Sequence, residues 1–291
     1  MTRTARPQAQ STNRQSLESE QVNYRHAFHA GNFADCMKHA LLVWLLRAMA
    51  RKPGPFAVLD THAGAGRYDL EGEQALRAGE WRGGIARLLE APPSELAEYV
   101  ALVRQCGLYP GSPVLIRALL RPQDRMICCE RHPDEYAALK RVMHGDARVS
   151  VHHRDAWEAL GALLPPAERR GLVLIDPPYE AADEFSRLAA GLRMGHARFA
   201  TGVFAAWYPI KHRAPVRDFH SQMRETRDVI AAELWLREPL DPARLNGCGL
   251  LLINPPYRFE SEAPRILRAL LSRVGTGESG GGIALERLAD E

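Results

Sequence analysis

The sequence predicts an α/β protein whose core is an open, mostly parallel β-sheet. Two short apolar runs, at residues 56–59 and 171–175, are each followed by an aspartate, Asp60 and Asp176. Runs of this length are typical of strands buried on both faces. Between residues 125 and 175, further apolar runs alternate with helical patterns. Because ligands bind where the parallel strands of such sheets end, the two aspartates mark the expected site.

Length and composition favour one large domain. The chain has 291 residues, 46% of them hydrophobic, which suffices for a single large core. A net charge of +3 and a pI near 8.6 permit a nucleic-acid partner without requiring one. Five cysteines without a Cys-x-x-Cys pair favour reduced thiols, and hence a cytoplasmic location, over disulfides or zinc. No apolar run is long enough to cross a bilayer, so no membrane partner is expected.

The first residues differ in composition from the rest of the chain. Residues 1–21 are rich in polar side chains and have almost nothing apolar to bury, so they are predicted to be a disordered extension. The alternative is a basic arm that grips nucleic acid, but Glu18 and Glu20 dilute its charge. The folded domain is therefore expected to cover residues 22–291.

An aromatic and basic segment, residues 24–32, precedes a predicted helix over residues 33–51. Asn32 is a suitable N-cap for this helix. Lys38 and His39 lie about one turn into the helix and are placed to face the site. The two histidines before the helix match no familiar zinc-ligand spacing, so no metal is predicted. Two interpretations of the segment stay open: a polar start of a packing helix, and a lip that contacts substrate.

The first predicted strand leads into the glycine-containing loop Asp60-Thr-His62-Ala-Gly64-Ala-Gly66. Glycine lets the backbone approach a ligand closely. A dinucleotide site would need a full G-x-G-x-x-G sequence, which this loop lacks. The looser pattern suits S-adenosylmethionine, which has no phosphate. Alone it is a weak signal, but a second acid-ended strand strengthens it.

The next predicted strand, residues 125–130, comes much later than the usual 20 or so residues after the first strand. A helical insertion subdomain at about residues 70–120 is therefore predicted, overhanging the site. A helix near residues 135–142, a strand at residues 147–152 and a helix through Leu163 follow. Acids after three successive strands, Asp60, Glu130 and Asp155, suit a ligand with a sulfonium, ribose hydroxyls and an adenine amine. Each acid alone is more often a helix cap.

The loop Asp176-Pro177-Pro178-Tyr179 suggests the chemistry. Pro177 has no N–H, so the Asp176 side chain and the Asp176 and Pro177 carbonyls are expected to act as acceptors. Two acceptors on an exocyclic adenine amine return its delocalised lone pair to nitrogen, and the ring of Tyr179 is expected to stack on the base, worth roughly 1–3 kcal/mol. The alternative is a simple strand-ending turn, which leaves the glycine loop unexplained.

Further strands are predicted at residues 199–207, 229–236 and 249–253. The first is expected to end in Trp207-Tyr208-Pro209. The sequence Asn254-Pro-Pro-Tyr257 resembles the site loop, but no helix and strand pair is expected after it, so it is interpreted as a structural turn. Residues 275–282 are expected to be a flexible link to a short last segment, residues 283–288.

Six motifs together carry a resemblance to a known family. They are Tyr-Arg-His-x-Phe-His-Ala-Gly-Asn at 24–32, Lys-His at 38–39, Leu-Asp-Thr-His-Ala-Gly-Ala-Gly-Arg-Tyr at 59–68, Tyr-Pro-Gly-Ser at 109–112, Asp-Pro-Pro-Tyr at 176–179 and Trp-Tyr-Pro at 207–209. From about Asn23 onward the chain resembles the bacterial 23S ribosomal RNA adenine-N6 methyltransferases, ribosomal large subunit methyltransferase J. The family pattern has glycine where this chain has Ala156 and histidine where it has Phe33.

The resemblance implies a Rossmann-like class I S-adenosylmethionine-dependent methyltransferase with a helical insertion after the first strand. It implies methylation of the N6 amine of one adenine in 23S ribosomal RNA. Beside it, we expect no metal and a monomer. Asp176, with Pro177 and Tyr179, would be catalytic, while Tyr24, Lys38 and Asp176 would contact the substrate nucleotide. The cofactor contacts would fall on His39, His62, Ser112, Glu130, Asp155 and Ala156.

Two rival functions are considered beside this one. A DNA adenine-N6 methyltransferase would carry the same Asp-Pro-Pro-Tyr loop. A non-catalytic nucleic-acid-binding protein linked to DNA uptake or use would keep the fold, although the intact Asp176 and glycine loop argue against it.

Overall fold

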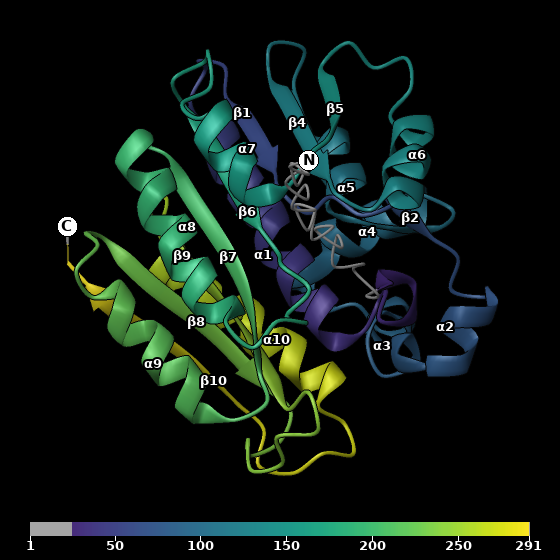
Figure 1. Cartoon of the computed structure of the whole chain (residues 1–291). Coiled ribbons are helices and arrows are strands. Elements are labelled where there is room, and N and C mark those ends of the chain that lie inside the picture. Colours follow the sequence, from purple (N-terminus) through teal and green to yellow (C-terminus); the bar gives the residue numbers. More distant parts are fainter. Residues whose placement is uncertain (1–24, 291) are drawn as a thin grey trace, which may run out of the picture.

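The computed structural model describes residues 25–290, so the predicted extension at residues 1–21 and Tyr24 lie outside the described residues. Eight strands form one sheet in the order β10-β8-β9-β7-β6-β1-β4-β5 (Figure 1). They are β1 (Ala57–Asp60), β4 (Arg125–Glu130), β5 (Val149–His153), β6 (Gly171–Ile175), β7 (Val203–Ile210), β8 (Val229–Trp235), β9 (Gly247–Ile253) and β10 (Gly282–Ala289). A separate pair joins β2 (Arg67–Tyr68) to β3 (Tyr109–Pro110).

The direction of the strands confirms the predicted Rossmann-like α/β fold. Strands β5, β4, β1, β6 and β7 are parallel neighbours, whereas β9 is antiparallel to β7 and β8, and β10 is antiparallel to β8. From β1 the chain builds outward through β4 to β5, and it then returns to add β6 and β7 on the other side. The order therefore reverses between β1 and β6, which is where such folds bind ligands.

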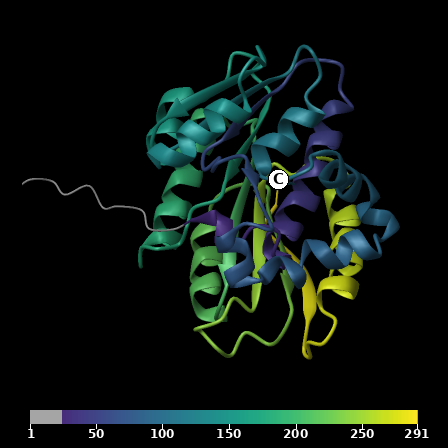
Figure 2. The ribbon, with the colours of Figure 1, turned by 90° about the vertical axis from the view of Figure 1, so that its right-hand side faces the viewer.

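Helices cover both faces of the sheet (Figure 2). The helices α1 (Phe33–Ala50), α5 (Ser112–Leu119), α6 (Pro133–Val142) and α10 (Phe259–Val274) contribute to the core on one face. The helices α7 (Ala156–Leu163), α8 (Glu184–Arg198) and α9 (Arg213–Met223) cover the other. Residues of β6 alternate between these cores: Leu172 and Leu174 face the first, and Val173 and Ile175 the second.

Several short elements lie between β1 and β4. They are α2 (Glu73–Ala78), η2 (Glu80–Arg82), α3 (Ile85–Glu90), η3 (Ser94–Leu96) and α4 (Ala97–Gln105). Of these, α3 and η3 pack against α10, α4 packs against α1, and α2 contacts the short turn η1 (His26–Phe28). The last element of the segment, α5, belongs to the helix layer beside the sheet. An independent subdomain over residues 70–120 stays a prediction.

The bounds predicted for the strand after residue 199 are corrected at both ends. Strand β7 begins at Val203 rather than at Phe199, which follows the last residue of α8. It also continues through Pro209 to Ile210, where it pairs with β9. Proline is tolerated there because β6 ends opposite Ala206, so no hydrogen bond to β6 is lost with the missing N–H. Residues 283–288, expected as a short last segment, lie in strand β10.

The Asn254-Pro-Pro-Tyr257 loop after β9 was expected to have no helix and strand after it. A helix and a strand, α10 and β10, do follow it, although Pro264 interrupts the helical pattern in sequence. Because β9 runs antiparallel to β7, Asn254 lies at the opposite edge of the sheet from Asp176. Its side-chain amide donates hydrogen bonds to the carbonyl oxygens of Ala200 and Gly202.

Candidate active site

The carboxyl ends of the parallel strands gather most of the sequence-predicted residues at one edge of the sheet. Asp60 ends β1, Glu130 ends β4, Asp155 follows β5 and Asp176 follows β6. The sequence placed these acids at strand ends, most directly for β1, β4 and β6, which are short apolar runs. What the structure adds is the set of contacts between these acids and residues far away in sequence.

Asp176 is held by an ion pair from helix α1. The Lys38 ammonium lies 2.5 Å from one carboxylate oxygen of Asp176 and 2.9 Å from a carboxylate oxygen of Asp35. Burial lowers the pKa of Lys38, but the charges of Asp176 and Asp35 outweigh burial and hold that pKa well above its usual range. Lys38 therefore contacts Asp176 at this edge of the sheet, and its ammonium carries a positive charge. Asp35 is the residue that the sequence interpretation left without a role, although its i, i+3 spacing to Lys38 is the signal.

The backbone of the Asp176 loop is fixed from two sides. The Asp176 N–H donates to Nδ1 of His62 over 3.3 Å. Tyr179 adopts a left-handed conformation with φ of 53°, which is strained for a residue with a side chain. Its hydroxyl donates to the Trp207 carbonyl over 2.9 Å, and its ring packs against Trp207 and Phe185. Among the described residues, none donates a hydrogen bond to the carbonyl oxygen of Asp176 or Pro177.

His62 is neutral in this site. Burial lowers its pKa to about 4, against the opposite effect of the Asp176 charge. Its Nδ1 lies 3.3 Å from the Asp176 nitrogen and 2.9 Å from the Thr61 hydroxyl oxygen. The ring lies edge-on to Trp157 of α7, with centroids 5.9 Å apart. His62 thus ties the glycine loop to the Asp176 loop.

The glycine loop is folded tightly against Glu130 and Tyr68. Gly64 and Gly66 have φ of 60° and 82°, and a Cβ on Gly64 would lie 2.2 Å from the Tyr68 hydroxyl. The Gly64 N–H donates to one oxygen of Glu130 over 2.8 Å, and the His132 N–H donates to the other over 2.6 Å. Burial raises the pKa of Glu130. Gly64 is therefore needed for this close approach, and the positive φ of Gly66 also favours glycine.

Asp60 is the most deeply buried of the predicted acids. One oxygen accepts a hydrogen bond from the Ser112 hydroxyl at the start of α5, over 2.7 Å. The other oxygen is buried without a hydrogen-bond partner among residues 25–290. Burial raises the pKa of Asp60 to about 7. A carboxylate oxygen left in this state is suited to a cationic or hydrogen-bond-donating ligand.

The other predicted residues have structural partners of their own. Asp155 caps α7 by accepting bonds from the N–H groups of Trp157 and Glu158, and Ala156 is the first residue of that helix. His39 is almost completely buried, with Nδ1 3.0 Å from the Tyr109 hydroxyl, and burial lowers its pKa to about 3. The roles assigned to these residues stay predictions.

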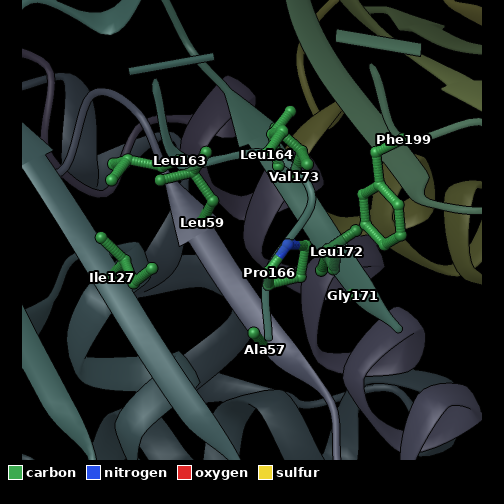
Figure 3. A pocket seen from close by; sticks show the side chains of 10 residues that line it. All are labelled: Ala57, Leu59, Ile127, Leu163, Leu164, Pro166, Gly171, Leu172, Val173 and Phe199. Atoms are coloured by element: carbon green, nitrogen blue, oxygen red, sulfur yellow. The ribbon is translucent and has the colours of Figure 1, made fainter. Parts of the chain in front are cut away.

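Two other features were considered as sites. A small cavity lies beside β1 and β6, where the chain segments after α7 and α8 reach the sheet, and its ten lining residues carry no polar side chain (Figure 3). Its volume of about 10 Å³ leaves room for little more than one water molecule. Within residues 25–290 there is neither a group of three or more potential metal ligands nor a helix long and apolar enough to cross a bilayer.

Comparison with known proteins identifies close relatives. A family model described as "Ribosomal RNA large subunit methyltransferase D, RlmJ" matches residues 53–287. The chain is 39% identical over 271 residues to ribosomal RNA large subunit methyltransferase J of Escherichia coli (strain K12), covering 89% of this chain and 97% of that protein. The Haemophilus influenzae protein of the same name is 37% identical over 270 residues, which cover 88% and 96%.

A solved structure is also similar throughout. The crystal structure of a protein from Legionella pneumophila has a TM-score of 0.82 and 38% sequence identity, covering 89% of this chain and 98% of that one. The similarity in structure therefore extends over most of the chain.

Proposed function

The chain belongs to the ribosomal RNA large subunit methyltransferase J family, and we propose that it transfers a methyl group from S-adenosylmethionine to the N6 amine of one adenine in 23S ribosomal RNA. The observation that carries the adenine-N6 part is the Asp-Pro-Pro-Tyr loop, whose Asp176 carboxylate is fixed by Lys38 beside the glycine loop. We propose that the protein acts as a monomer.

The residues present fit S-adenosylmethionine. The buried, unpartnered oxygen of Asp60 and the tight glycine loop form a cradle with negative charge. Residues proposed to hold the molecule are His39, His62, Ser112, Glu130, Asp155 and Ala156. When bound, S-adenosylmethionine supplies an electrophilic methyl group on a sulfonium. Ionised carboxylates such as Asp60 and Glu130 would stabilise that positive charge.

The reaction requires the chain to orient and polarise a weak nucleophile. Asp176 accepts a hydrogen bond from the adenine amine, and the Pro177 carbonyl accepts a second, so that the amine lone pair returns to nitrogen. Lys38 occupies one oxygen of Asp176 and leaves the other for the amine. Tyr179 supports the base with a ring whose orientation is set by its bond to Trp207. This is catalysis by positioning and preorganised hydrogen bonds.

The substrate base must leave its stack to reach this loop. Extrusion costs a few kcal/mol from a duplex and less from a loop. Sequence-specific RNA recognition favours unstacked bases, and the mild overall charge of the chain suits a local rather than an extended contact. Lys38 and Tyr24 are proposed to contact the nucleotide, although Tyr24 lies outside the described residues.

A substrate comparison tests the proposal. Labelled methyl groups from S-adenosylmethionine are offered with protein-free 23S RNA, with assembled ribosomal particles and with DNA of matched sequence, and the products are digested to nucleosides. N6-methyladenosine in RNA is the expected product. Label found only in DNA would instead support a DNA adenine-N6 methyltransferase. Measurable cofactor binding without transfer to any substrate would support a non-catalytic nucleic-acid-binding protein.

A further inference from the structure

Asp35, in the first turn of α1, uses its two carboxylate oxygens for different purposes. One oxygen accepts a bond from the Gly31 N–H over 3.0 Å and lies 2.9 Å from Nε2 of His26. The other lies 2.9 Å from the Lys38 ammonium. The first oxygen therefore stabilises the start of the helix, and the second is reserved for Lys38.

Lys38 is in turn shared between two carboxylates. Its ammonium has three protons, and two of them point to Asp35 and Asp176. The side chains of Asp35 and Lys38 are only 2% and 6% exposed, whereas that of Asp176 is 17% exposed. A lysine ammonium sits on a flexible four-carbon stem, so a second, buried carboxylate determines where it comes to rest.

We propose that Asp35 is a positioning residue of the transfer reaction, which holds the Lys38 ammonium on one oxygen of Asp176 and thereby keeps the other oxygen directed at the substrate amine. The inference rests on the proposed function, since it takes Asp176 as the acceptor of that amine. It concerns a residue that need not touch the substrate itself.

The charges around Lys38 support this arrangement. Asp35 pairs with Lys38 from the same helix, and Asp176 pairs with it from the loop after β6. The other titratable groups that interact with this cluster electrostatically are His26 in the preceding turn, His39 in the helix, Asp60 at the end of β1 and His62 in the glycine loop. Burial raises the pKa of Asp35, but His26 and Lys38 outweigh burial and hold it well below its usual range. Asp35 therefore keeps its negative charge, which is what anchors the ammonium.

The variant Asp35→Asn separates the two uses of the side chain. An asparagine retains one oxygen for the Gly31 N–H but presents an amide to Lys38, which cannot accept from an ammonium. The single-turnover rate of methyl transfer is expected to fall roughly 10²-fold, as for a displaced catalytic group, with cofactor affinity within about twofold of wild type because no ligand contact is removed. Asp146→Asn, which breaks the 2.6 Å ion pair to Arg148 away from the site, is the matched control and should keep the wild-type rate.

A double-mutant cycle distinguishes positioning from general loss of structure. If Asp35 acts through Lys38 on Asp176, adding Asp35→Asn to an Asp176→Asn protein should lower the methyl-transfer rate hardly any further. Equal losses in both backgrounds, or a wild-type rate in Asp35→Asn alone, would overturn the inference. Should Asp35→Asn fail to fold, Asp35→Glu keeps the charge but misplaces it, and its rate loss must vanish in the same background.

A measurement without substrate keeps this inference separate from the proposed function. The ¹⁵N resonance of the Lys38 ammonium is followed against pH in the full chain. The ammonium should lose its proton at lower pH in Asp35→Asn than in wild type or Asp146→Asn, because one of its two carboxylates is gone. An unchanged titration would contradict the inference even if methyl transfer is observed. Conversely, a wild-type protein without transfer to RNA refutes the function, while this titration still decides whether Asp35 holds the charge of Lys38.

Discussion

The replacement Asp60→Asn gives a stability change whose size and pH dependence follow from the structure. In the folded, ligand-free protein, burial raises the pKa of Asp60 to about 7, against about 3.9 in an unfolded chain. The folded state therefore binds this proton more tightly. Protonation of Asp60 therefore stabilises the folded protein. This stabilisation is fully present below about pH 4 and is lost as the pH rises through 7. Above that pH the ionised carboxylate costs about 4 kcal/mol, at 1.36 kcal/mol for each pKa unit.

Asparagine has nearly the same shape and does not titrate. The free energy of unfolding of Asp60→Asn minus that of wild type should therefore grow by about 3 kcal/mol between pH 5 and pH 8.5. Urea unfolding of both proteins at the two pH values, without S-adenosylmethionine, measures this difference. Any constant effect of the amide on Ser112 cancels, because only the change with pH is used.

Asp124→Asn is the control for Asp60→Asn. Asp124 is also fully buried, but hydrogen bonds from Arg121 and the Phe56 N–H outweigh burial and lower its pKa. Its stabilising contribution is lost only as the pH falls below about 4, so this variant should be destabilised equally at pH 5 and pH 8.5. A difference for Asp60→Asn that is flat or shrinks with rising pH would refute the assignment of a buried, unfavourable carboxylate at the end of β1.

Three further variants test other parts of the site. Gly64→Ala forces a Cβ to 2.2 Å from the Tyr68 hydroxyl at φ of 60°, so S-adenosylmethionine affinity should fall at least about tenfold by calorimetry; unchanged affinity would show that the loop does not hold the cofactor. Tyr179→Phe loses the bond to the Trp207 carbonyl and should lower the free energy of unfolding by about 1 kcal/mol, with only a several-fold loss of kcat; a loss above a thousandfold would give the hydroxyl a direct chemical role. Lys38→Met leaves two carboxylates without their shared cation and should destabilise the fold by about 3 kcal/mol in urea unfolding, whereas a neutral result would contradict the buried ion pair.

The fold was largely predictable because its signals are local. The strands β1, β4 and β6 are short apolar runs, and the acids that end them follow directly in sequence. Parallel strands then place those acids at one edge. The helix α10 was missed because Pro264 breaks its pattern, although its apolar residues recur at helical spacing.

The contacts that complete the site were not predictable in the same way. Ser112 reaches Asp60 across 52 positions of sequence, and Lys38 reaches Asp176 across 138. No periodicity or motif links such residues, because their proximity is set by the order in which the strands assemble. The resemblance to a known family named Ser112, Lys38 and Asp176 as site residues, and Asp60 was expected there because it ends a strand. Neither argument gave the ion pair of Lys38 with Asp176 or its second contact, with Asp35.

The most direct test of the central claim compares wild type with Asp176→Ala. Both proteins are incubated with S-adenosylmethionine and protein-free 23S RNA, and N6-methyladenosine is quantified after digestion to nucleosides, with cofactor binding measured in parallel. We predict N6-methyladenosine with wild type and a rate lower by about 10²–10³ in Asp176→Ala, which should still bind the cofactor. Equal rates, or methylation of a different nucleoside, would contradict Asp176 as the acceptor of an adenine amine.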